Sequence, residues 1–123
     1  MKHLASTILV AILFVFAANA QTVVESGKFE FNNSQTGYML DKNQGERVLT
    51  FEVKFKNPFA TKPQIVIALT KIDANNQKVI RLKVEPSFIT NEGFIVKAMT
   101  WGDSMIHGIG GNWMAITTGT EGN

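Results

Sequence analysis

The sequence predicts an all-β domain of the sandwich or barrel type. Three observations support this fold class. Apolar and polar residues alternate in several runs, no long segment has a 3.6-residue period, and turn-forming residues separate the runs. The six runs are short, with polar breaks between them, which is typical of β-sandwiches and β-barrels.

The first two expected strands alternate clearly. Residues 28–31 read Lys-Phe-Glu-Phe and stop at an Asn-Asn-Ser cluster. Residues 47–55 place four large apolar side chains on one face and mainly polar ones on the other: Leu49, Phe51, Val53 and Phe55 against Val48, Thr50, Glu52 and Lys54. The stretch between these strands, residues 32–46, is the longest irregular piece, and long ordered loops are often functional.

Four further strands follow. Residues 65–72 form a nearly continuous apolar run after Pro63, as expected for a strand that is covered on both faces. Residues 80–85 and 94–101 alternate, and residues 106–117 are rich in glycine first and apolar later. The sequence therefore predicts one domain with no repeat or linker.

Two of these strands lack a polar second face. Opposite the expected core face of the fifth strand lie Ile95, Met99 and Trp101, and the third strand offers Val66 and Ala68. An apolar outer face on a sandwich sheet is usually covered by a partner subunit. Scattered exposed apolar residues are the ordinary alternative. We expect the chain to self-associate.

Residues 1–20 have the features of a cleaved signal peptide. A short basic head is followed by an uncharged segment at 4–20 that ends in Ala18-Asn19-Ala20, with small residues where signal peptidase cleaves. The alternative is a membrane anchor, but 17 uncharged residues are short for a hydrocarbon core of ~30 Å. We therefore expect a secreted domain at residues 21–123 without a stable membrane anchor.

Composition excludes several classes of protein. The chain has 12 basic and 10 acidic residues, and Lys2 is the only one of them in the leader, so the mature domain is nearly neutral. Charge-driven nucleic-acid binding is therefore not expected. There is no cysteine, and His107 is the only histidine beyond the leader, so we expect no metal site and no cofactor. No nucleophile–base pair or distinctive carboxylate pair suggests an enzyme.

Short motifs in the second half of the chain occur in a characteristic order: Phe55-Lys56-Asn57-Pro58-Phe59, Pro63-Gln64-Ile65-Val66-Ile67-Ala68-Leu69, Ile72-Asp73, Arg81, Asn91-Glu92-Gly93-Phe94, Thr100-Trp101 and Asn112-Trp113. This set resembles the H-type lectin family, the domain of snail agglutinins and of the C-terminal part of discoidins. The resemblance implies a six-stranded antiparallel β-sandwich that forms a homotrimer. It also implies sugar sites at the subunit junctions that prefer galactose or N-acetylgalactosamine.

Arg81 stands where the family has its sugar-binding arginine, and the alternation of its strand directs it away from the core. Trp101 matches an aromatic residue of the family site. A sugar needs a rigid multi-donor group, an acceptor beside it and a flat apolar surface, which arginine, a carboxylate and an aromatic ring supply. The alternatives are a solvated arginine and a tryptophan in the subunit interface. Trp113 aligns with a core tryptophan.

The remaining site residues depart from the family pattern. His107 replaces a family tyrosine and can still present a ring and a hydrogen-bonding nitrogen, whereas Gly102 stands where a histidine is found. The acidic partner comes in the family from a Gly-x-Asp loop, which this chain lacks. Asp41 is the candidate for that role, followed by Gln44, and Tyr38 is a candidate second aromatic.

The sequence thus predicts a secreted lectin for terminal galactose or N-acetylgalactosamine. Its binding would be multivalent through trimerisation, because linked weak sites gain avidity together. The alternative is a trimeric extracellular structural or adhesive module with a degenerate sugar site.

Overall fold

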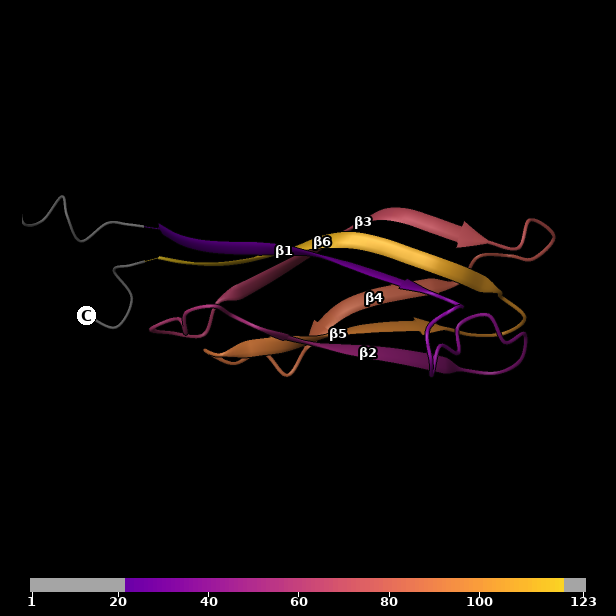
Figure 1. Cartoon of the computed structure of the whole chain (residues 1–123), viewed down its shortest axis with the longest axis horizontal. Coiled ribbons are helices and arrows are strands. Elements are labelled where there is room, and N and C mark those ends of the chain that lie inside the picture. Colours follow the sequence, from indigo (N-terminus) through magenta and orange to yellow (C-terminus); the bar gives the residue numbers. More distant parts are fainter. Residues whose placement is uncertain (1–21, 119–123) are drawn as a thin grey trace, which may run out of the picture.

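A computed structural model of the chain describes residues 22–118, so the expected leader lies outside the described residues. The described part folds into two facing layers of β-strands (Figure 1). The strands are β1 (Thr22–Asn32), β2 (Arg47–Lys54), β3 (Gln64–Ala74), β4 (Leu82–Ser87), β5 (Gly93–Thr100) and β6 (Ile106–Thr118). Within this part no helix is long and apolar enough to cross a membrane.

Each layer is a three-stranded antiparallel sheet. Sheet A has the order β1-β6-β3 and sheet B has the order β2-β5-β4, so β6 and β5 are the central strands. The expected all-β class, six strands and antiparallel sandwich are confirmed. Strand β1 is longer than the alternation at residues 28–31 predicted, and β4 begins two residues after the expected start at residue 80.

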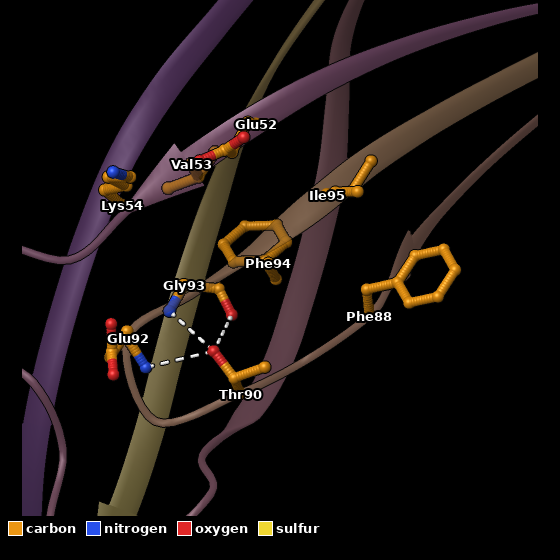
Figure 2. Close-up of a pocket in the computed structure, with 9 residues that line it drawn as sticks. All are labelled: Glu52, Val53, Lys54, Phe88, Thr90, Glu92, Gly93, Phe94 and Ile95. Carbon is orange, nitrogen blue, oxygen red and sulfur yellow. Dashed lines mark hydrogen bonds between the residues drawn. The ribbon is translucent and has the colours of Figure 1, made fainter.

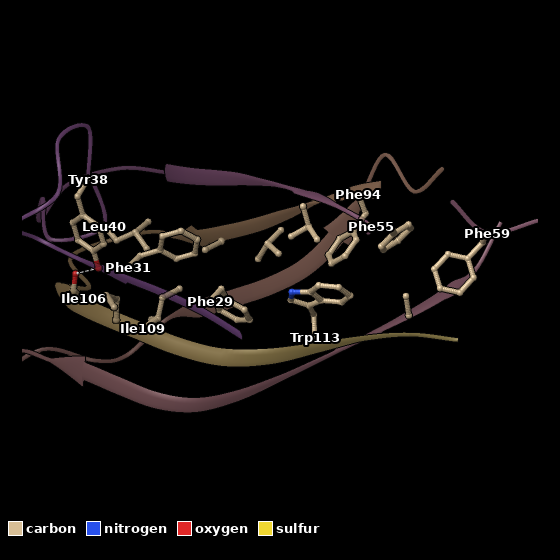
Figure 3. Close-up of a cluster of buried hydrophobic side chains, with 14 residues drawn as sticks. Phe29, Phe31, Tyr38, Leu40, Phe55, Phe59, Phe94, Ile106, Ile109 and Trp113 are labelled. Carbon is tan, nitrogen blue, oxygen red and sulfur yellow. Dashed lines mark hydrogen bonds between the residues drawn. The ribbon is translucent and has the colours of Figure 1, made fainter. Parts of the chain in front are cut away.

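The core fills the space between the sheets and is aromatic at one end (Figure 3). Phe55 and Phe94 both pack against Trp113, with ring centroids 6.0 and 5.4 Å apart respectively. Trp113 is 7% exposed and is a core residue, as expected. Gly27 lies over its indole, where a Cβ would come within 2.6 Å of Nε1. Only a residue without a side chain fits there.

Alternation correctly predicted the two faces of β5 but not the cover of β3. The residues of β5 expected in the core, Phe94, Val96, Ala98 and Thr100, are all buried. Strand β3 is instead an edge strand of sheet A, and Val66 and Ile72 are 53% and 45% exposed. The expectation of a strand covered on both faces is therefore wrong for the single chain.

The long loop at residues 33–46 closes one end of the sandwich, beside the start of β6 (Figure 1). Tyr38 and Leu40 are buried, the Tyr38 hydroxyl donates to the carbonyl of Ile106 at 2.6 Å, and the Ile106 amide donates to the carbonyl of Leu40 at 2.9 Å (Figure 3). Burial, followed by the negative charges of Asp41 and Asp73, raises the pKa of Tyr38. Tyr38 is therefore a core residue and not an exposed second aromatic.

Candidate functional site

Arg81 and Trp101 lie together at one end of sheet B. Strand β4 pairs with β5 so that Leu82 is opposite Thr100, and Arg81 and Trp101 are the next residues along the two chains. Because Leu82 and Thr100 face the core, the side chains one position further face outward. Trp101 is 41% exposed. The strand register thus brings the two predicted residues to the same edge.

The backbone of Arg81 is held on both sides by buried hydroxyl groups. The Thr100 hydroxyl donates to the carbonyl of Arg81, and the amide of Arg81 donates to the Ser104 hydroxyl at 3.1 Å. Thr100 and Ser104 are both fully buried. A backbone fixed in this way limits where the arginine side chain can go, and a binding group needs that preorganisation.

The guanidinium of Arg81 is held by Asp103. Its Nη1 lies 2.9 Å from Oδ1 of Asp103, while Lys78 Nζ lies 3.9 Å from the other carboxylate oxygen. Gly102 has a positive φ of 67°, and a Cβ there would stand 3.4 Å from Nη1 of Arg81. The guanidinium therefore lies over the glycine, in the space that opens where the family pattern has a histidine.

Arg47 fixes the loop that carries Trp101 and Asp103. Its side chain is 4% exposed and donates to three carbonyls: Gly45 from Nε at 2.9 Å, Ser104 from Nη1 at 2.7 Å and Gly102 from Nη2 at 2.8 Å. Charge-assisted hydrogen bonds to three carbonyls offset part of the cost of burying the cation. Arg47 therefore ties the 33–46 loop to the 101–105 loop.

Sequence reasoning missed Asp103 and Arg47 as parts of the site. Asp103 was one of several aspartates in turn contexts, and only the β4–β5 register brings it to Arg81. Arg47 left a signal, because it alternates with Leu49 and Phe51 and so occupies a core-facing position at the start of its strand. A charged residue at such a position predicts a buried, hydrogen-bonded side chain.

Asp41 and His107 lie at the same end of the sandwich but do not contact Arg81. Oδ1 of Asp41 and Nδ1 of His107 are buried without a hydrogen-bond partner in the described residues. The carbonyl of His107 accepts from the amide of Asn33 at 2.9 Å. Within residues 22–118 no hydrogen bond or ion pair joins either side chain to Arg81. Their places in a sugar site therefore stay predictions.

The arrangement has the chemistry that a polar, partly apolar ligand requires. A half-exposed indole offers a flat apolar surface, Arg81 offers several fixed donors, and Asp103 offers acceptor oxygens beside them. In the part of the chain that the structure describes, no three acidic or histidine side chains are grouped to hold a metal ion. A sugar ring has hydroxyl groups and an apolar C–H face that match this set.

The sequence matches the H-type lectin domain over residues 50–116, which is more than half of the chain. The chain belongs to the H-type lectin domain family. This family consists of carbohydrate-binding lectin domains, and the match confirms the expected resemblance. The matched range includes Arg81, Trp101 and Asp103 but not Asp41 or Arg47.

Individual relatives agree with the family match. Discoidin-1 of Dictyostelium discoideum is 32% identical over 79 residues, which is 62% of this chain but only 30% of that protein. ORF 7 of the ATP synthase subunits region of Fuscovulum blasticum is 27% identical over 94 residues, 76% of this chain and 82% of that protein.

Solved structures support the fold. Discoidin II of Dictyostelium discoideum superposes with a TM-score of 0.69 at 24% identity, covering 79% of this chain and 37% of that chain. A second structure of wild-type discoidin II gives a TM-score of 0.70 at 23% identity. The lectin sandwich therefore spans well under half of the discoidin chains that it matches.

Proposed function

We propose that this protein is a secreted lectin that binds galactose- or N-acetylgalactosamine-type sugars and acts as a homotrimer. The observation that carries the proposal is the guanidinium of Arg81, held 2.9 Å from Asp103 beside the exposed indole of Trp101. The family supplies the class of ligand, and the leader at residues 1–20 supplies the expected export.

The three side chains divide the work of sugar recognition. The indole of Trp101 covers the apolar C–H face of the ring, which is continuous in galactose-type sugars because their axial hydroxyl points to the other face. Arg81 donates to ring hydroxyls from the N–H groups that Asp103 does not use. Asp103 accepts from a neighbouring hydroxyl, and its charge strengthens that hydrogen bond.

Trimerisation would complete the site and multiply its strength. Ile95 and Met99 lie half-buried on the outer face of sheet B, with Trp101 at its edge, as the self-association hypothesis requires. In this arrangement Asp41 of one subunit would approach the Arg81 of its neighbour, and His107 would line the same junction. Three weak sites held together raise avidity by ~10²–10⁴.

One observation favours the alternative, a trimeric structural or adhesive module without sugar binding. The ion pair between Arg81 and Asp103 is complete within one chain, so it can exist simply as a surface contact. In addition, Gly102 removes a ring that the family pattern has beside Trp101. Both readings require the trimer, and they differ only at the sugar site.

The test is glycan binding by the Arg81→Ala variant, with Lys83→Ala as the matched control. Lys83 is another cation on sheet B, in a surface pair with Glu85 at 3.4 Å. We expect binding to terminal N-acetylgalactosamine to fall at least about tenfold in Arg81→Ala only, with the trimer mass unchanged in light scattering. A wild-type protein that forms a trimer but binds no glycan selects the structural module. A monomer contradicts both readings.

A further inference from the structure

Phe88 is an unusual residue at the opposite end of sheet B from Arg81. It follows the last residue of β4, its φ is +48°, and it is 80% exposed. It is the only non-glycine residue with a positive φ among residues 22–118. A left-handed conformation is unfavourable for a bulky side chain, and the fold does not bury this ring in return. A strained, exposed aromatic residue of this kind points to a role outside the core.

A hollow of about 240 Å³ lies beside Phe88 (Figure 2). Glu52 and Lys54 come from the end of β2, Gly93 and Ile95 from the start of β5, and Glu92 from the turn before it. Gly93 makes the close approach of the strands possible, because a Cβ there would stand 2.1 Å from the carbonyl oxygen of Val53. The volume is below the roughly 300–1,000 Å³ of sites for drug-sized ligands, which suits a single ring.

The base of the hollow is fixed by Thr90. Its hydroxyl accepts from the amides of Glu92 at 3.1 Å and Gly93 at 3.2 Å and donates to the carbonyl of Gly93 at 3.2 Å (Figure 2). The amide of Thr90 donates to the same carbonyl at 2.9 Å. These bonds hold the turn between β4 and β5 rigid. The position of Phe88 at its entrance is therefore defined, which lowers the entropic cost of binding a ligand there.

The charged groups of the hollow are available to a ligand. Among residues 22–118, no ion pair involves Glu52, Glu92 or Lys54. An apolar protein surface or a lipid interior would leave both carboxylates desolvated, which is costly. A saccharide would instead offer hydroxyl donors to the carboxylates, a hydroxyl acceptor to the lysine, and a C–H face to the Phe88 ring.

We propose that this hollow is a second saccharide-binding site, with Phe88 as its aromatic plate. The inference rests on the proposed lectin function and extends it. The two ends of sheet B carry the same three kinds of side chain: Trp101, Asp103 and Arg81 at one end, and Phe88, a glutamate and Lys54 at the other. Strand β5 separates them by about 25 Å. Each subunit would thus hold two sugars facing opposite directions and could bridge two glycans by itself.

The experiment uses Phe88→Asn, because asparagine tolerates a left-handed conformation and the exposed ring contributes little to the core. The probes are methyl glycosides of galactose, glucose, mannose and N-acetylgalactosamine, followed by amide chemical shifts in NMR titrations. In an Arg81→Ala background we expect one of these sugars still to shift the amides of Glu92 and Gly93. Adding Phe88→Asn should weaken that binding at least tenfold, while the thermal midpoint stays equal or rises. Phe88→Trp should retain it.

The two proposals fail in different ways. If no sugar shifts the Glu92 and Gly93 amides, or if Phe88→Asn leaves the titration unchanged, the second site does not exist. Phe88-dependent binding to lipid vesicles without any sugar-induced shift would overturn it too. Failure of the Arg81 site appears separately, as sugar binding near Trp101 that is absent in the wild type or indifferent to Arg81→Ala.

Discussion

Nη1 of Arg81 lies 2.9 Å from Oδ1 of Asp103, although the two residues are 22 positions apart and belong to different loops. The contact exists because the register of β4 on β5 aligns the loop before one strand with the loop after the other. It gives the guanidinium a defined direction beside Trp101. Asp103 is thereby the carboxylate that a single chain supplies to the site.

Replacing Asp103 with asparagine tests this assignment. The variant keeps the size of the side chain but removes the charge that orients Arg81 and accepts strongly from a hydroxyl. We expect sugar affinity to fall about tenfold or more in calorimetric titration, since one charge-assisted hydrogen bond corresponds to this range. Stability should fall by less than about 1 kcal/mol because both partners are partly exposed. Unchanged affinity would show that Asp103 only decorates the surface.

Replacing Arg47 with methionine is expected to affect stability first. The change leaves the carbonyls of Gly45, Gly102 and Ser104 without their donor in a buried place. The loss should be on the order of 3 kcal/mol in urea unfolding, because each unsatisfied buried group costs about 1–3 kcal/mol and partial relaxation recovers some of it. The conservative variant Arg47→Lys should lose less, since one of the donors survives.

Arg47 also predicts a link between stability and binding. If it positions the 101–105 loop, Arg47→Lys should weaken sugar binding at a temperature where the variant is still fully folded. A variant of equal stability with a change far from this loop, such as Ile65→Val in β3, serves as the control. Equal sugar affinity in both variants would limit Arg47 to a structural role.

The alternation of β5 shows what a sequence can predict about this fold. Its period of two identified which side chains fill the core and which face outward, and the outward set includes Trp101. Periodicity is a local property and survives without knowledge of the partner strands. The pairing of Asp103 with Arg81 is not local, because it depends on which strands are neighbours and in which register. The sequence therefore predicted Arg81 but not its carboxylate.

Strand β3 and Tyr38 show a second limit. An apolar run on β3 indicated cover on both faces, but composition does not reveal that the strand lies at the edge of its sheet. Tyr38 resembled an exposed loop aromatic because its loop is polar in sequence. Its burial arises from the way that loop closes over β6, which is a tertiary effect. Faces of strands were thus easier to predict than the cover of those faces.

Tyr38 predicts a loss of stability in alkali. Its pKa is raised by burial and by nearby carboxylates, so the folded protein keeps the proton above the ordinary value of about 10 while the unfolded chain loses it. The contribution of the neutral phenol is complete below pH ~10 and is lost as pH rises from there toward the folded pKa. Tyr38 is the only tyrosine, so phenolate absorbance reports its ionisation directly.

Tyr38→Phe separates this effect from the titration of lysines. The variant should lose about 1 kcal/mol at neutral pH, because the carbonyl of Ile106 loses its phenolic donor. Its stability should then fall less steeply than that of the wild type above pH ~10. If the phenolate of the folded wild type forms at pH ~10, the buried hydrogen bond does not protect the hydroxyl.

Replacing Met99 with lysine tests the face proposed for trimerisation. Met99 lies on the outer face of sheet B between Val48 and Lys83, and a second lysine there would place like charges together and remove apolar contact area. We expect light scattering to report a mass of one subunit at micromolar concentration. Met114→Lys, which changes a 40% exposed methionine on the outer face of sheet A, should leave the trimer intact. Dissociation by Met114→Lys alone would place the interface on sheet A and contradict the assignment of this face.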